Sequence, residues 1–295
     1  MLVRSSVSLS GTDVSLRTMR NKIALLMFWV IGFLSVSPSP VSAQPIAFRK
    51  TTPAGLESRL RDCPERSAQR LKKLRELFLA AGCAEDGLSE QPVKGSPEPN
   101  LVCTWRGEME STILIGAHYD NEGSGHGVID NWSGAVLLPI LYESLKAFPR
   151  KHTFVFVAFA AEEAGLLGSK SYAGHMTSEE VARTRAIINL DCLGLGSTAV
   201  WVSHSDKGLV GMLDRLAAAA KLPLRGANVD RVGSTDEESF SRHKIPKISL
   251  HSMSQRTFQN INSFNDNFDV VRWQDYYDSY LLVAAYLAYL DSALK

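Results

Sequence analysis

The sequence has no excess of charge of either sign. Its 295 residues include 32 lysines and arginines and 31 aspartates and glutamates, for a formal net charge of +1. It also lacks any block of like charges or basic stripe, the features by which proteins attract the phosphate backbone of a nucleic acid. We therefore expect no nucleic-acid partner. No internal repeat is present, and the length fits a single α/β domain once a leader is set aside.

Cysteine is scarce. The four positions are Cys63, Cys83, Cys103 and Cys192, and none of their spacings is of the CxxC type. This argues against a zinc site built from cysteines. Cys83 and Cys103 flank one segment and could pair, but Cys63 is also available, and spacing alone does not decide the connectivity. Cys192 follows an apolar run, and we expect it to be a buried free thiol.

The apolar run near the N-terminus, residues 23–36, is too short to span a membrane comfortably. Basic residues precede it from Met19, and small residues suited to cleavage follow it just before Gln44. This is the pattern of a secretory signal peptide over residues 1–43. Met19 is an alternative start of translation, and an uncleaved membrane anchor is the alternative reading of the segment. We expect an exported protein, periplasmic or secreted, with no membrane span in the mature chain and with disulfides permitted.

Residues 44–99 are expected to form a helical segment and a surface loop, packed on the catalytic domain of residues 100–295. Asp62 and Glu65 offer a capping box at the start of the helix, with Pro64 in its first turn. Apolar residues then recur at helical spacing, and basic residues occupy the other face, which we expect to be solvated. The apolar face is Leu71, Leu74, Phe78 and Ala81, and the basic face is Arg70, Lys72, Lys73 and Arg75.

Short apolar runs alternate with helical patterns after residue 100. The expected strands are residues 101–106, 112–115, 153–160, 187–190, 199–203 and 247–251, and the expected helices are residues 134–148, 165–172, 178–185, 209–221 and 274–294. This alternation predicts an α/β fold with a mainly parallel sheet. Residues 153–160 are almost continuously apolar, as in a central strand that is buried on both faces. Gly107 and Glu108 lie between the first two runs and suggest a hairpin-like pair.

Ionisable residues stand where two of these strands end. His118 and Asp120 follow the second expected strand, Glu162 and Glu163 follow the third, and Asp130 lies between them, just before a helical pattern. Because ligands of open α/β sheets gather at the carboxyl ends of the strands, we expect these side chains to form one site. Imidazole and carboxylate groups suit a divalent metal such as zinc, and a carboxylate can bridge two ions.

The two adjacent glutamates leave a strand at successive positions, so their side chains diverge. One can then bind metal while the other moves protons on a bound water. Each residue also has a simpler explanation. His118 could be an ordinary core or surface histidine, the glutamates could be solvated or begin a helix, and Asp130 could cap the helix that follows. Together, at the ends of apolar runs, they favour a metal site.

The chain carries, in order, the motifs GAHYD, DNWSGA, AFAAEEAGLLGSKSY and NLDCLG. Their order and spacing resemble those of the dizinc aminopeptidases of metallopeptidase family twenty-eight, which also includes glutaminyl cyclases and some non-catalytic relatives. The resemblance extends from about residue 100 to the C-terminus. It implies a three-layer αβα fold around a mixed, mainly parallel sheet, and a zinc-dependent exopeptidase that acts on peptides.

By this resemblance four residues are zinc ligands. His118 and Asp191 resemble ligands of one ion, and Glu163 resembles a ligand of the second. Asp130 resembles the carboxylate that bridges the two ions. The resemblance therefore implies two zinc ions in one site.

Two more residues resemble parts of the catalytic machinery. Glu162 resembles the general base. Asp120, two residues after His118, resembles the carboxylate that orients the imidazole. The resemblance implies that a metal-activated water attacks the peptide bond and that Glu162 carries the proton to the leaving amine. The sequence indicates neither the preferred substrate residue nor the oligomeric state.

The resemblance fails at two positions. The family's last ligand is a histidine in a motif Ile-His-Thr-x-x-Asp, and Asn262 stands at that place. In the segment STDEESF, Asp236 is retained but Glu237 replaces a histidine that is often found there. An amide oxygen is a weaker zinc ligand than an imidazole nitrogen, so we expect a weak second zinc site. Asn262 could ligate through its carbonyl, His251 could replace it, or the second site could stay empty.

Two other functions are compatible with this sequence. A glutaminyl cyclase uses a single zinc, at the site that Asp130 and Glu163 would build with the missing histidine. Asn262 therefore argues against a cyclase more than against a peptidase. The other alternative is an exported binding module that keeps the fold without turnover.

Overall fold

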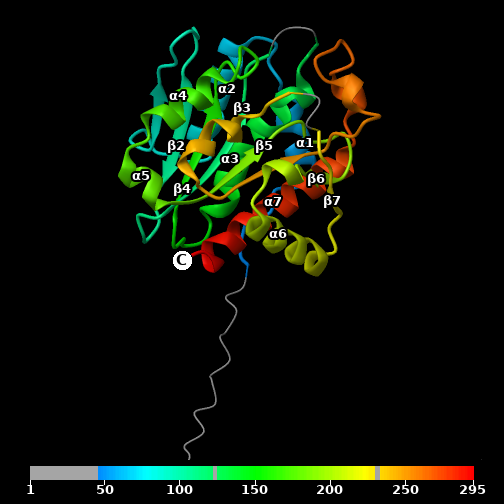
Figure 1. Ribbon diagram of the computed structural model, residues 1–295. Coiled ribbons are helices and arrows are strands. Elements are labelled where there is room, and N and C mark those ends of the chain that lie inside the picture. The colour runs from blue at the N-terminus through cyan, green and yellow to red at the C-terminus, as the bar shows by residue number, and fades with distance from the viewer. Residues whose placement is uncertain (1–45, 122–124, 230–232) are drawn as a thin grey trace, which may run out of the picture. The chain divides into compact units, whose positions relative to one another are not determined.

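Eight strands among the described residues form one mixed sheet in the order β1-β2-β4-β3-β5-β8-β6-β7 (Figure 1). The computed structural model describes residues 46–121, 125–229 and 233–295, all within the unit Gln44–Lys295. The predicted signal peptide and the alternative start at Met19 lie outside the described residues. The strands are β1 (Leu88–Gln91), β2 (Asn100–Trp105), β3 (Thr112–His118), β4 (Thr153–Phe159), β5 (Thr184–Leu190), β6 (Thr198–Val200), β7 (Leu224–Gly226) and β8 (Lys247–His251).

The middle of the sheet is parallel. β4, β3, β5 and β8 run in the same direction. β2 pairs antiparallel with both β1 and β4, and β6 pairs antiparallel with β8 and parallel with β7. The predicted mixed, mainly parallel sheet is therefore confirmed. Because the parallel strands share a direction, the carboxyl ends of β3, β4 and β5 meet at one edge.

Helices cover both faces of the sheet. They are α1 (Pro53–Arg61), α2 (Ser67–Ala80), α3 (Ser133–Leu145), α4 (Leu167–His175), α5 (Ser178–Arg183), α6 (Lys207–Ala220) and α7 (Trp273–Ala293). One core holds α1, α2, α3, α6 and α7, and a smaller core on the other face holds α4 and α5. The three-layer αβα arrangement is thus confirmed.

Alternation along β3 shows how the sequence makes the two cores. Ile113 and Ile115 belong to the larger core, and Leu114 between them belongs to the smaller one. Successive residues of a strand point to opposite faces, so a strand that is apolar at every position needs helices on both sides. The same holds for β4, which lies between β2 and β3 as a strand buried on both faces.

The hairpin-like pairing predicted for the first two apolar runs is wrong. β4 lies between β2 and β3, so these two strands do not pair. The backbone N–H groups of Glu108 and Met109 donate to the carbonyls of Arg150 and Lys151, which places the connection over the start of β4. The connection is long enough to pass one strand, and the apolar β4 is better buried inside the sheet than at its edge.

The start of the N-terminal helix also differs from the prediction. α2 begins at Ser67, and no side chain caps it. Asp62 instead follows the C-terminal end of α1, a helix that the sequence patterns did not indicate although Pro53 stands at its first position behind the cap Thr52. Of the predicted apolar face, Leu74 and Phe78 are buried in α2, but Arg70, which was predicted for the solvated face, is buried with them.

One disulfide joins Cys83, just after α2, to Cys103 on β2. This decides the pairing that the spacing left open. Cys63 and Cys192 are free, and Cys192 is buried as predicted. The bridge ties the N-terminal helical segment to the sheet.

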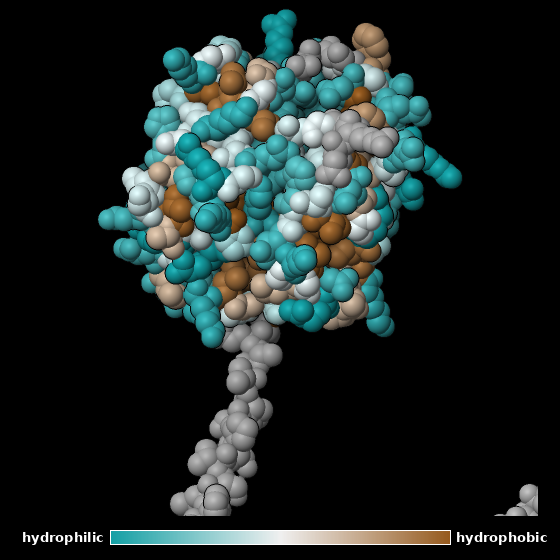
Figure 2. Space-filling model, viewed as in Figure 1, coloured by the Kyte–Doolittle hydropathy of each residue, from teal (hydrophilic) through white to brown (hydrophobic). Residues whose placement is uncertain are grey.

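The surface is mixed in polarity. In the view of Figure 2, hydrophobic residues gather in separate patches among polar ones instead of forming one continuous face. Within the part of the chain that the structure describes, none of the helices is long and apolar enough to cross a bilayer.

Candidate metal centre

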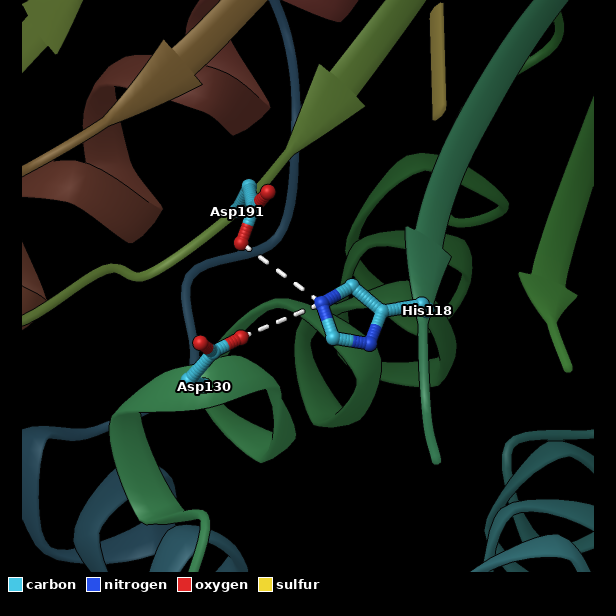
Figure 3. A group of neighbouring side chains, drawn as sticks. All are labelled: His118, Asp130 and Asp191. Carbon is cyan, nitrogen blue, oxygen red and sulfur yellow. Dashed lines mark ion pairs between the residues drawn. The ribbon is translucent and has the colours of Figure 1, made fainter. Parts of the chain in front are cut away.

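His118, the last residue of β3, lies at the centre of a group of acidic side chains (Figure 3). Its Nε2 atom is 3.2 Å from Asp130 Oδ1 and 3.7 Å from Asp191 Oδ1. Asp191 follows β5, and Asp130 lies in the short helix η1 (Val128–Trp132) before α3. All three side chains are buried and point toward one another, so the structure brings these predicted ligands together.

The predicted pair of glutamates reaches the same histidine from the neighbouring strand. Glu162 and Glu163 follow β4, and their carboxylate oxygens and a ring nitrogen of His118 all lie within 4.8 Å of one another. Glu162 Oε2 is 4.0 Å from His118 Nε2. All the predicted metal ligands and Glu162 line one cavity of about 310 Å³.

Asp120 connects the two strand ends. Its two carboxylate oxygens accept the backbone N–H groups of Glu162 and Glu163, at 3.0 and 3.1 Å. Oδ1 is also 3.4 Å from Nδ1 of His118, on the side of the ring that faces away from Asp130 and Asp191. A carboxylate at this place holds the ring so that Nε2 faces the cavity.

Asp130 is held by its backbone and does not cap the helix that follows. Asp266 accepts the N–H groups of Ile129 and Asp130, at 2.7 and 2.9 Å. The next residue, Asn131, accepts the N–H of Gly134 at the start of α3 and donates to the carbonyl of Leu190 beside Asp191. The carboxylate of Asp130 is therefore left to face His118. Asp266 is the aspartate at the end of the motif that contains Asn262, and the family resemblance gave it no role in the site.

Asp191 is oriented by a chain of two hydrogen bonds. Thr235 Oγ1 donates to Asp191 Oδ2 at 3.0 Å, and Asn189 Nδ2 donates to Thr235 Oγ1 at 2.6 Å. The other oxygen, Asp191 Oδ1, is buried and has no hydrogen-bond partner among the described residues. It is also the oxygen that faces His118 Nε2. A buried carboxylate oxygen with no donor is the kind of atom that a cation satisfies.

The electrostatics of the site also favour a cation. Burial raises the pKa of Glu162 to about 10, and the charges of Asp236, Asp191 and Asp130 add to the rise while that of His118 opposes it. Burial alone would lower the pKa of His118, but the charge of Glu162 and the surrounding aspartates raise it well above its usual range. Neighbouring carboxylates repel one another in this way unless a positive charge lies between them. The donor set and its charge therefore fit a divalent metal ion.

The sequence profile of Peptidase family M28 matches residues 100–287. The chain belongs to peptidase family M28. The resemblance carried by the sequence motifs is thereby confirmed.

Two curated relatives of this M28 chain are named for an enzymatic activity, and one of them is an aminopeptidase by name. Leupeptin-inactivating enzyme 1 of Streptomyces exfoliatus is 30% identical over 167 residues, which are 55% of this chain and 38% of the relative. Aminopeptidase YwaD of Bacillus subtilis is 32% identical over 133 residues, 43% of this chain and 29% of the relative. The M28 chain therefore spans less than two fifths of the length of either relative.

Solved structures share the fold. A zinc aminopeptidase from Bacillus subtilis superposes with a TM-score of 0.60 at 22% identity, covering 67% of this chain and 50% of its own. A glutaminyl cyclase from an Acidobacteriales bacterium superposes with a TM-score of 0.72 at 14% identity, covering 87% of this chain and 99% of its own. At these identities the likeness establishes the fold of the M28 chain.

Asn262, which stands in place of the family's last histidine, and His251, its possible replacement, have different surroundings. Asn262 lines the cavity, as Glu163 does, and has left-handed backbone geometry with φ of 51°. His251 is not among the cavity-lining residues: its Nδ1 accepts the N–H of Met253, and its Nε2 is 3.4 Å from the carbonyl of Ala227. The structure therefore does not place His251 where it could replace the missing ligand.

Glu237 also lies outside the candidate ligand groups. It is fully buried, and its Oε1 is 3.2 Å from His204 Nδ1. Its neighbour Asp236 is buried next to the site, and burial raises the pKa of Asp236 to about 7. Sequence reasoning considered these two residues and passed over Thr235, which makes the direct contact with Asp191.

Proposed function

We propose that this M28 chain is an exported, zinc-dependent aminopeptidase that removes residues from the N-terminus of peptides. The observation that supports it best is the convergence of His118, Asp130, Asp191, Glu162 and Glu163 on one cavity at the carboxyl edge of the sheet. The membership in a peptidase family and the relative named Aminopeptidase YwaD support the same reaction.

The ligand set would hold two ions. His118 and Asp191 would bind the first, Glu163 the second, and Asp130 would bridge them, with Asn262 at the edge of the second position. Zinc held by these residues would supply a positive charge that lowers the pKa of a water and polarises the scissile carbonyl. The second ion would be held weakly, because an amide oxygen is a poorer zinc ligand than imidazole.

Glu162 would carry the proton in this reaction. It lies in the cavity beside His118 Nε2, and its backbone is fixed by Asp120. The carboxylate must be ionised to accept a proton from the attacking water, and nearby positive charge lowers the pKa that burial raises. The protonated Glu162 then donates to the leaving amine.

The rest of the cavity would select an N-terminal residue. The carboxylates near the ion held by Glu163 would bind a free α-amino group, because the two carry opposite charge. Apolar residues of the cavity would accept the first side chain of the substrate, and the residues are Leu166, Met253, Phe258 and Ile261. We therefore expect an apolar first residue to be preferred over a charged one.

Export is supported by the disulfide and by the sequence pattern of residues 1–43. Disulfides persist in oxidising compartments and are rare in the cytosol. The bond between Cys83 and Cys103 therefore fits a protein that leaves the cytosol.

The test uses purified chain from Gln44 onward, loaded with zinc. Release of nitroaniline from leucine p-nitroanilide and two zinc ions per chain by elemental analysis are the expected results. Glu162→Gln should abolish release and keep the metal content, whereas the exposed Glu179→Gln should change neither. Metal without release would favour the binding module. Cyclisation of an N-terminal glutamine would favour the second candidate, a glutaminyl cyclase. The solved structure of one such enzyme aligns with 87% of this chain and with 99% of its own length.

A further inference from the structure

Arg70 of α2 is fully buried, although the sequence pattern predicted a solvated face for it. Its guanidinium donates hydrogen bonds to five backbone carbonyls, those of Pro64, Tyr119, Asp120, His126 and Gly127. Trp132 lies beside it, with its ring centroid 5.8 Å from the guanidinium carbon. The side chain is thus enclosed by carbonyl groups from three segments of the chain.

The carbonyls belong to the segments that carry the metal ligands. Nη1 donates to the carbonyls of Tyr119 and Asp120, at 3.3 and 3.2 Å, immediately after His118. Nη2 donates to the carbonyls of His126 and Gly127, both at 2.8 Å, immediately before the short helix that contains Asp130. One planar guanidinium group therefore joins the segment that follows His118 (the His118 side) to the segment that precedes Asp130 (the Asp130 side).

Gly127 shows how tightly this contact is built. Its φ is +57°, in the left-handed region, and a Cβ added there would lie 2.7 Å from Arg70 Nη2. A side chain at residue 127 would push the guanidinium off the carbonyls. The glycine therefore allows the backbone to approach the arginine closely.

Only arginine can make this set of bonds. Its five N–H groups form a rigid, planar fork, whereas a lysine ammonium is a single point with three donors. A lysine at residue 70 could donate to the carbonyls on one of the two sides but not to those on both. The bond from Nε to the carbonyl of Pro64, at 2.9 Å, also fixes the fork relative to the connection that precedes α2.

We propose that Arg70 is the positioning residue of the metal centre. It sets the distance between the His118 side and the Asp130 side, so that α2, which lies outside the region matched to family M28, controls metal affinity. This rests on the proposed function in that the centre is taken to bind zinc. The proposal needs no turnover.

The experiment measures metal binding without substrate. Chain from Gln44 onward is stripped with a chelator, and zinc affinity is measured by competition with a chromogenic chelator. The variants are Arg70→Met, Arg70→Lys and the control Arg75→Met. The control removes a half-exposed arginine of the same helix, which pairs with Glu85 and Glu90. The visible spectrum of the cobalt-loaded protein reports the coordination geometry, and the melting temperature of the stripped protein reports the fold.

We expect Arg70→Met to weaken zinc binding by about 10- to 100-fold, the range seen when a group that orients a ligand is removed. The cobalt spectrum should change as well. Arg70→Lys should recover part of the affinity, and Arg75→Met should match the wild type.

A purely structural role would lower the melting temperature of the stripped protein and leave affinity and spectrum unchanged, and that result would overturn the proposal. If Arg70→Met does not fold, Arg70→Lys decides: wild-type affinity and spectrum in that variant overturn it. If the wild-type chain binds no zinc, both the proposed function and this inference are wrong. If all variants bind zinc with the same affinity, only the role of Arg70 is wrong.

Discussion

Asp266 holds Asp130 in place across 136 residues of sequence, through a 2.9 Å hydrogen bond from the backbone N–H of Asp130 to Asp266 Oδ2. Its other oxygen accepts the N–H of Ile129. Both carboxylate oxygens of Asp266 are therefore used on the backbone next to the candidate bridging ligand. The side chain of Asp130 can then face His118 without forming a helix cap itself.

Asp266→Asn tests this contact. The amide keeps the shape but presents an NH₂ group to one of two N–H donors, and a buried donor left without an acceptor costs about 1–3 kcal/mol. We expect the free energy of unfolding in urea to fall by that amount and zinc affinity to fall with it. Asp269→Asn, on the exposed surface of the same segment, is the matched control. Unchanged stability and affinity in Asp266→Asn would show that the contact does not position Asp130.

Thr235→Val tests the orientation of Asp191. Valine has the shape of threonine but lacks the hydroxyl that donates to Asp191 Oδ2, so the carboxylate is free to turn. We expect about 10-fold weaker zinc binding by chelator competition, because ligand-orienting partners are commonly worth that much. Thr235→Ser keeps the hydroxyl and should bind as the wild type does. Equal affinities of the valine and serine variants would contradict this role.

Asn262→His tests the weakness of the second zinc position. Histidine is tolerated in left-handed backbone geometry better than most residues, and it supplies the imidazole that family M28 uses at the matching place. We expect the affinity for the second equivalent of zinc to rise, with little change for the first. The measurement is a stoichiometric zinc titration followed by calorimetry. Asn265→His, on the same loop and exposed, is the control, and an identical titration for both variants would mean that residue 262 does not reach the ion.

His251 gives a pH dependence away from the candidate ligands. Burial lowers the pKa of His251 from 6.5 to about 4. As the pH falls, the unfolded chain therefore binds a proton at this histidine at a higher pH than the folded chain does. The contribution of this pKa shift to the free energy of unfolding is fully present above pH 6.5 and decreases as the pH drops toward 4. It is lost below that pH, and the total loss is about 3 kcal/mol.

The measurement compares urea unfolding of wild type and His251→Gln between pH 7 and 4. The variant should lose stability less steeply over this range, because glutamine does not titrate. His175→Gln, which changes an exposed histidine, should follow the wild-type curve. Parallel curves for wild type and His251→Gln would show that His251 is not the titrating group.

Local pattern was sufficient for the fold class and for the prediction of one site at the carboxyl edge of the sheet, whereas the ligand roles came from the family resemblance. Each apolar run after residue 100 became a strand, since burial of such a run on both faces leaves few alternatives. His118, Asp120, Glu162 and Glu163 could be picked out because these polar residues follow an apolar run at its carboxyl end. That property is readable from the chain itself, wherever the strand lies in the sheet.

Strand order and long-range hydrogen bonds were decided only by tertiary structure. The place of β4 between β2 and β3, the pairing of Cys83 with Cys103, and the burial of Arg70 all depend on which segments meet. Arg70 lies on the same face of α2 as Leu74 and Phe78, but its charge led to the prediction of a solvated side chain. Nothing near it in sequence indicates the carbonyls of Tyr119 and Gly127 that its guanidinium binds. A hydrogen bond between residues that lie about fifty positions apart or more leaves no local pattern, because its partner is supplied by the fold.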